Sequence, residues 1–335
     1  MGARLYVADT GGGVHALNSK TGAESPDYVS FSKATLSDGV LYAENGAMLE
    51  ARRLDSLPTV SQRATERTPP LWQSPIPLNF KFLRAPVVAG GAVFIHGFSP
   101  SDSLAGKRAF QGLNAFDAKT GALRWKWELE DKIDAFLTYG LAADKSAAYL
   151  WMVDKTESIF GKGVLIVFDA LTGREKWRRN TSMFVAALDA PLLFDSNAVV
   201  IPDYPAVKDA NADGAGYLYR ALDRATGDKV WESQTPWKYQ TSVTAEGLLF
   251  ASDKKVHQVL TENNNTSPDS WVSAVNVRTG KELWRSQSVE LGVFTLPAAG
   301  EGMVVVGSKP FLWAGDPAVA GKDSVAGIYA WRQTQ

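Results

Sequence analysis

Residues 166–177 read IVFDALTGREKW, and close copies of this phrase recur along the chain. The other copies are HALNSKTGAE at 15–24, NAFDAKTGALRW at 114–125, RALDRATGDKVW at 220–231 and SAVNVRTGKELW at 273–284. A recurrence every 50 or so residues is typical of one supersecondary unit that is copied many times. The repeat therefore indicates a fold built from several copies of one structural unit.

Each position in the phrase has a mechanical explanation. The apolar run before the Asp or Asn predicts a buried strand. The Asp or Asn, as in Asp169, bonds its own backbone two or three residues on and begins a turn, and the glycine, as in Gly173, completes it with a positive φ. Each of the last four glycines is followed, four residues later, by a Trp that is expected to bury its indole between adjacent sheets. We interpret these residues as structural.

A hairpin rich in β-formers accompanies the phrases, and the two patterns together make four antiparallel strands, A to D, per repeat. The hairpins lie at 85–97, 140–153, 195–202, 244–252 and 297–307. Such a unit is the signature of a β-propeller blade. Degenerate C strands at 49–55, with Trp72 as the D-strand anchor, and at 326–331 bring the count to seven blades, with eight as the alternative. The sequence thus predicts an all-β, single-domain propeller over residues 1–335.

The two ends of the chain are expected to carry incomplete blades. The first recognisable strand, ARLYVAD at 3–9, has the character of a B strand, and the last, AGIYAW at 326–331, that of a C strand. A D strand and an A strand upstream of Met1 would complete both blades. We expect this N-terminal strand pair to be lacking, with an open ring as the alternative.

The phrase A-x-[DN]-x-x-T-G-x-x-x-W and the preceding P-V-V-x-x-G-x-V hairpin resemble the pyrroloquinoline-quinone-like (PQQ-like) propeller repeat. Quinoprotein alcohol dehydrogenases and many non-enzymatic propellers share it, so the resemblance implies a fold and leaves the function open. The dehydrogenases typically carry a vicinal disulfide over the quinone. A chain with no cysteine cannot form that bond. The resemblance therefore favours a non-enzymatic member and argues against PQQ as a cofactor.

Composition narrows the classes of partner. The net charge is -1, from 35 basic and 36 acidic residues, which gives no electrostatic reason to expect nucleic acid. The sequence also has no apolar stretch long enough for a transmembrane helix. The lack of cysteine and the style of the repeat favour an extracytoplasmic location, in the periplasm or at the cell surface.

The connections between the B and C strands point to a binding face. They are short in the first two blades and are predicted to be long at 98–111, 154–162, 203–215, 253–270 and 309–326. Long loops are uncommon unless they are functional. Since strands alternate in direction, these loops are expected on one face, where a protein partner or a glycan would bind. The aromatic residues predicted to make contact are Phe160, Tyr204, Trp271, Phe311 and Trp313.

One of these loops carries a pattern of calcium ligands. Asp209, Asn211 and Asp213 place side-chain oxygens at positions 1, 3 and 5, and Gly214 follows at position 6. Position 12, where an EF-hand has Glu, is Arg220. The pattern leaves two interpretations, a Ca²⁺ site and a turn that needs no ion.

The sequence thus predicts a non-catalytic binding or scaffold propeller, similar in its repeat to the outer-membrane-assembly lipoprotein propellers of Gram-negative bacteria. The alternatives are a dehydrogenase-like propeller that depends on a quinone and calcium, and a surface domain that recognises carbohydrate.

Overall fold

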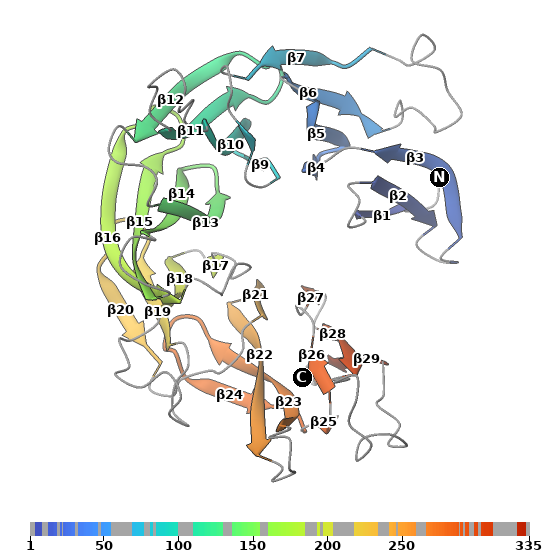
Figure 1. Cartoon of the computed structure of the whole chain (residues 1–335), viewed down its shortest axis with the longest axis vertical. Coiled ribbons are helices and arrows are strands. Elements are labelled where there is room, and N and C mark those ends of the chain that lie inside the picture. Colours follow the sequence, from blue (N-terminus) through green and yellow to red (C-terminus); the bar gives the residue numbers. More distant parts are fainter. Residues whose placement is uncertain are drawn as a thin grey trace, which may run out of the picture. The chain divides into compact units, whose positions relative to one another are not determined.

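β-Strands account for the regular structure of the described residues, as the repeat predicts. The strands form antiparallel sheets in which most neighbours along the chain pair with each other (Figure 1). The computed structural model describes residues 4–8, 13–18, 21, 23–30, 33–45, 48–54, 69–76, 81–82, 85–99, 110–129, 136–154, 160–184, 193–194, 197–203, 218–233, 241–245, 247–258, 266–287, 289–290, 292–294, 298–300, 303–310 and 327–332.

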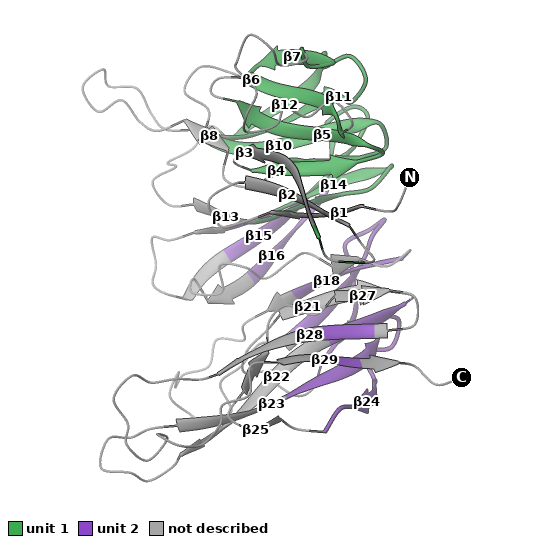
Figure 2. Ribbon diagram, turned by 90° about the vertical axis from the view of Figure 1, so that its right-hand side faces the viewer, with its two compact units in different colours: residues 1–150, 167–176 green, residues 151–166, 177–335 purple. Residues whose placement is uncertain are grey.

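The chain divides into two compact units, and unit 1 comprises residues 1–150 and 167–176 (Figure 2). Its first sheet contains β1 (Arg4–Ala8), β2 (Gly13–Asn18) and β3 (Glu24–Ser30). Its second contains β4 (Ala34–Ser37), β5 (Val40–Asn45), β6 (Met48–Arg53) and β7 (Trp72–Pro75). Its third contains β8 (Lys81–Phe82), β9 (Val87–Ala89), β10 (Ala92–Ser99), β11 (Phe110–Asp117) and β12 (Leu123–Leu129).

A fourth sheet contributes residues to both units. It contains β13 (Phe136–Ala143), β14 (Ala147–Asp154), β15 (Phe160–Asp169) and β16 (Glu175–Phe184).

Unit 2 comprises residues 151–166 and 177–335, and three further sheets lie within it. The first contains β17 (Leu193–Phe194), β18 (Ala198–Asp203), β19 (Leu218–Asp223) and β20 (Lys229–Glu232). The second contains β21 (Thr241–Ala245), β22 (Leu248–Gln258), β23 (Thr266–Asn276), β24 (Glu282–Arg285) and β25 (Val289–Glu290). The third contains β26 (Gly292–Phe294), β27 (Ala298–Gly300), β28 (Met303–Pro310) and β29 (Gly327–Arg332).

The order of the strands matches the A-B-C-D unit expected of a propeller blade. The two degenerate repeats are confirmed, because β6 and β7 pair in the second sheet and β29 pairs with β28. The described first sheet has B, C and D strands, and the last has B and C strands with an A position divided between β26 and β27. The number of blades and the single-domain organisation stay predictions.

The turn chemistry of the repeat is also confirmed. In each of four turns the Asp or Asn side chain accepts hydrogen bonds from the backbone N–H groups two and three residues on, at 2.8 to 3.2 Å. The turn glycines have positive φ: 73° at Gly121, 71° at Gly173, 75° at Gly227 and 69° at Gly280. These angles favour glycine because a β-carbon is strained there.

A repeating contact, which we call the indole lock, joins the Trp of one repeat to the turn of the next. The indole N–H donates to the carbonyl of the residue that follows the turn Asp or Asn. The pairs are Trp72 with Ala118 at 3.0 Å, Trp125 with Ala170 at 3.0 Å, Trp177 with Arg224 at 3.1 Å and Trp231 with Val277 at 2.5 Å. A β-carbon on the glycine of each receiving turn would lie 2.5 to 2.6 Å from the same indole. Glycine is therefore needed in these turns both for φ and for room.

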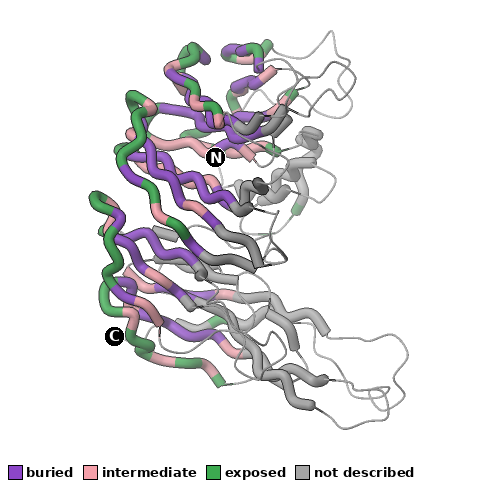
Figure 3. Tube along the Cα trace, turned by 60° about the vertical axis from the view of Figure 1, so that its left-hand side comes forward, coloured by how far each residue is buried: buried purple, intermediate pink, exposed green. Residues whose placement is uncertain are grey.

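The core lies between neighbouring sheets. In unit 1, Leu49 and Trp72 of the second sheet pack with Val93, Ile95 and Phe116 of the third. Along the trace, stretches of buried residues alternate with exposed turns (Figure 3). A buried aromatic side chain withdraws about 150–250 Å² from water, so the locked indoles are major contributors to this core.

Several segments predicted as loops are partly strand, and the prediction is wrong for those residues. The largest difference is at 253–270, where β22 continues to Gln258 and β23 begins at Thr266, with Lys255 opposite Asp269 in register. Likewise Ser99 pairs with Phe110, and β15 begins at Phe160. The residues of these segments are largely polar and give no apolar pattern from which a strand could be predicted. They pair through their backbones, which does not require such a pattern.

Candidate functional site

The described part of the predicted binding face centres on Trp271 in β23. Trp271 is partly exposed, and Phe160 is the first residue of β15. The other predicted contact residues, Tyr204, Phe311 and Trp313, and the predicted calcium ligands, Asp209, Asn211 and Asp213, lie outside the described residues. Calcium binding and the roles of these aromatic residues stay predictions.

Trp271 shares one face of its sheet with two other side chains, those of Ser273 and Arg285. Because side chains alternate along a strand, Trp271 and Ser273 share one face of β23. Arg285 of β24 is opposite Ser273 in register, and its guanidinium carbon lies 5.0 Å from the centroid of the Trp271 ring. This distance is within the range of a cation–π interaction. The structure thus places a cation over a partly exposed aromatic ring.

Among the residues that the structure describes, the charge of Arg285 is balanced by a neighbour on its own strand, Glu282. Its Nη2 donates to Oε2 of Glu282 at 2.8 Å, and its Nε to Oε1 at 3.2 Å. The two side chains are 50% and 36% exposed. An ion pair this exposed typically contributes about 0–1 kcal/mol, so Glu282 holds Arg285 weakly.

Two buried polar atoms beside this pair have no hydrogen-bond partner. They are the indole Nε1 of Trp271 and the hydroxyl Oγ of Ser273, and neither has an acceptor among the residues that the structure describes. A buried donor left unsatisfied costs about 1–3 kcal/mol. The cluster formed by Trp271, Ser273 and Arg285 is therefore rich in donors and short of acceptors.

The preceding sheet shows how the same positions look when they are satisfied. There the residues equivalent to Ser273 and Arg285 are Arg220 and Glu232, which are also paired in register. The Nε and Nη2 of Arg220 donate to Oε2 of Glu232 at 2.9 and 2.8 Å. In the β21–β24 sheet a serine stands in place of this arginine and an arginine in place of its acidic partner, so the cross-strand acceptor is lost.

The sequence pattern singles out Trp271 by its aromatic character and does not point to Ser273 or Arg285. The sequence does contain a sign of the difference. Arg285 directly follows the Trp of its repeat, and the same position in the preceding repeat is Glu232. Aligning the two repeats would have shown the exchanged charge. The contact with Trp271 required the register of β23 and β24.

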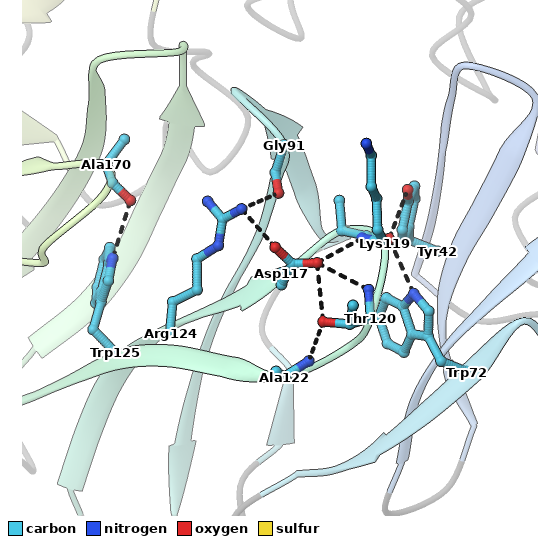
Figure 4. A network of polar contacts seen from close by, with 11 residues as sticks. Tyr42, Trp72, Gly91, Asp117, Lys119, Thr120, Ala122, Arg124, Trp125 and Ala170 are labelled. Atoms are coloured by element: carbon cyan, nitrogen blue, oxygen red, sulfur yellow. Dashed lines mark hydrogen bonds and ion pairs between the residues drawn. The ribbon is translucent and has the colours of Figure 1, made fainter.

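The aspartates with the clearest pKa shifts serve turns. The Arg124 guanidinium beside Asp117, together with the N–H groups of Lys119 and Thr120, holds the pKa of that carboxyl well below its usual range (Figure 4). Thr172 similarly lowers the pKa of Asp169. A perturbed pKa can mark a catalytic group. Here the cause is the turn geometry, which these two carboxylates stabilise.

The described residues hold no group of three His, Cys, Asp or Glu side chains that is arranged to bind a metal ion. Within the same part of the chain, no helix is long and apolar enough to cross a membrane.

Comparisons with known proteins show the family and the fold. A family model described as outer membrane protein assembly factor BamB, of the PQQ-like repeat type, matches residues 65–204 and 109–258. The chain belongs to this family. It is 23% identical over 322 residues to the outer membrane protein assembly factor BamB of Burkholderia pseudomallei, with 75% of this chain and 77% of that protein covered.

Solved structures of similar fold include BamB from Moraxella catarrhalis. That likeness has a TM-score of 0.52 and 17% identity and covers 91% of this chain and 78% of the other. The quinohemoprotein alcohol dehydrogenase ADHIIG from Pseudomonas putida HK5 matches at a TM-score of 0.46 and 11% identity, over 92% of this chain and 69% of the other. The first likeness supports the β-propeller fold, and the second carries no functional argument.

Proposed function

We propose that this chain is a non-catalytic β-propeller that binds a protein partner during the assembly of outer membrane proteins. The family match carries this proposal, because the matching model and the curated relative are both described as outer membrane protein assembly factors. We expect the chain to bind this partner outside the cytoplasm, on the side where outer membrane proteins are assembled.

The use of the repeat residues supports a scaffold function. The turn aspartates and the tryptophans, which are the most regular polar and aromatic features of the sequence, bond within the turns and across the indole locks. They thus serve the fold. Residues for binding are then expected at positions where repeats differ, and the cluster of Trp271, Ser273 and Arg285 is one such position.

The proposed binding face is the one that carries the B-to-C connections, with Phe160, Tyr204, Trp271, Phe311 and Trp313 as contacts. Trp271 supports this choice, because it is partly exposed and carries an arginine over its ring. Trp and Arg are the residue types most often found as energetic anchors of protein interfaces.

Deleting the gene in its own bacterium tests the function. We expect less β-barrel protein in the outer membrane and greater sensitivity to vancomycin, which an intact outer membrane excludes. A plasmid copy should restore both. Unchanged outer membrane protein levels in the deletion strain would refute the proposed function.

The dehydrogenase and carbohydrate alternatives have direct tests on the purified protein. Titration with PQQ and Ca²⁺ is expected to leave the quinone absorbance unchanged, and a shifted spectrum with dye reduction would favour the dehydrogenase. On a glycan array, binding by the wild type that Trp313→Ala abolishes would favour carbohydrate recognition.

A further inference from the structure

We propose that Arg285, stacked on Trp271, receives an aspartate or glutamate side chain of the partner polypeptide. This inference rests on the proposed function for the class of partner, a protein, and on the structure for the chemistry of the contact. It names the residue that would anchor the partner and the kind of group that it would hold.

The first observation concerns the hydrogen-bond donors of the cluster. The indole Nε1 of Trp271 and the Oγ of Ser273 are buried without a hydrogen-bond partner in the part of the chain that the structure describes. Arg285 adds a guanidinium above the same ring, at 5.0 Å. Nε1 and Oγ are covered, so Arg285 is the donor of this cluster that a ligand can reach, and a guanidinium suits a ligand with acceptor oxygens and preferably a negative charge.

The second observation is the availability of Arg285. Half of its side chain is exposed, and its ion pair with Glu282 is a surface pair of the kind that competes poorly with an incoming carboxylate. In the β17–β20 sheet the equivalent positions hold an ion pair between neighbouring strands, Arg220 with Glu232. The β21–β24 sheet has no acidic residue at the position of Glu232, so the acceptor of Arg285 within the chain is the exposed Glu282, which we expect a carboxylate of the partner to replace.

The third observation is that Trp271 holds the guanidinium of Arg285 in place. A guanidinium held over an indole keeps a fixed plane, and a planar guanidinium bonds a carboxylate through two parallel N–H groups. Trp271 therefore presents Arg285 in a defined orientation. Because Nε1 of Trp271 is itself covered, the carboxylate is received at the guanidinium, and the indole resonance reports its arrival.

The test is a titration followed by the indole N–H resonances of the ¹⁵N-labelled full chain, with Trp271→Phe used to assign the Trp271 signal. The probes are the α-amides of N-acetylaspartate and N-acetylasparagine, which differ in the charge of the side chain. We expect the Trp271 signal to move with the aspartate probe only. The Trp231 signal, whose N–H donates to Val277, should stay in place.

Two variants with the same change of charge make the test specific. Arg285→Gln should weaken the response to the aspartate probe by about tenfold or more, as expected for loss of a charge-assisted hydrogen bond. Arg278→Gln removes an exposed arginine from the turn of the same sheet and should leave the response unchanged. Equal responses to both probes, no response to the aspartate probe, or a full response in Arg285→Gln would overturn the proposal.

One internal acceptor needs a test of its own. Asp253 of β22 is opposite Trp271 in register. In Asp253→Asn without any probe, we expect the Trp271 signal to remain at its wild-type position. A displaced signal would mean that the chain itself supplies the acceptor, and would overturn the proposal.

The outcome is separable from that of the proposed function. A deletion strain with normal outer membrane protein levels together with a response to the aspartate probe would refute the function and keep the site. A deletion phenotype without that response would refute the site and keep the function.

Discussion

Replacing Gly280 by Ala tests whether the indole lock depends on contact between the glycine and the indole, and Gly247 provides a matched control. Both glycines lie in turns of the same sheet and have nearly equal backbone angles, with φ of 69° and 76°. They differ in surroundings. A β-carbon on Gly280 would lie 2.6 Å from Cε3 of Trp231, whereas one on Gly247 would meet nothing within 4 Å.

The magnitudes separate the two variants. An alanine in the left-handed region costs about 1–2 kcal/mol, and this applies to both positions. The change in the entropy of the unfolded chain is also common to both. Only Gly280→Ala adds the cost of pushing a buried indole aside, about 1–3 kcal/mol for overpacking. We expect Gly247→Ala to lose about 1–2 kcal/mol of unfolding free energy and Gly280→Ala about 2–5 kcal/mol.

The assay is urea unfolding followed by tryptophan fluorescence, with the free energy taken from the midpoint and the slope. The indole of Trp231 should also report the displaced contact in the folded state. Losses that agree within about 0.5 kcal/mol would refute the reasoning, since they would show that only the backbone angle matters in these turns.

Two further predictions concern buried groups. Trp231→Phe removes the N–H that bonds Val277 and should cost about 2–4 kcal/mol in urea unfolding, more than Trp284→Phe, whose indole is partly exposed. Burial lowers the pKa of His96 from 6.5 to about 3, so the folded chain keeps it neutral while the unfolded chain binds a proton below pH 6.5. Unfolding free energy should therefore fall as the pH drops, by about 2 kcal/mol at pH 5. His96→Gln should flatten this pH dependence, and an unchanged slope would contradict the assignment.

Much of the fold was predictable because the repeat encodes it locally. Asp169 and Gly173 specify a turn locally, the aspartate through the hydrogen bonds that its side chain accepts and the glycine through its positive φ. The Trp that follows requires burial wherever the fold places it. These signals also identified the degenerate strand at 49–55. They did not reveal how far β22 and β23 extend, because the polar residues at 253–258 and 266–270 pair through their backbones.

The candidate site was only partly predictable, for a physical reason. Trp271 could be singled out because large aromatic residues near loops often bind. The participation of Ser273 and Arg285 follows from the register of β23 and β24. It also depends on the loss of the cross-strand acceptor that the β17–β20 sheet retains in Glu232. Such an absence is visible in a sequence only when repeats are compared position by position.

The indole lock also has a consequence for the order in which the chain folds. Its two ends are separated by 45 to 47 residues in all four locks. If folding proceeds from the N-terminal end, the N–H of each Trp is satisfied only after about one further repeat has folded. The propeller should therefore gain stability in steps of one repeat, and a partly folded chain would carry one unsatisfied indole at the edge of its folded part.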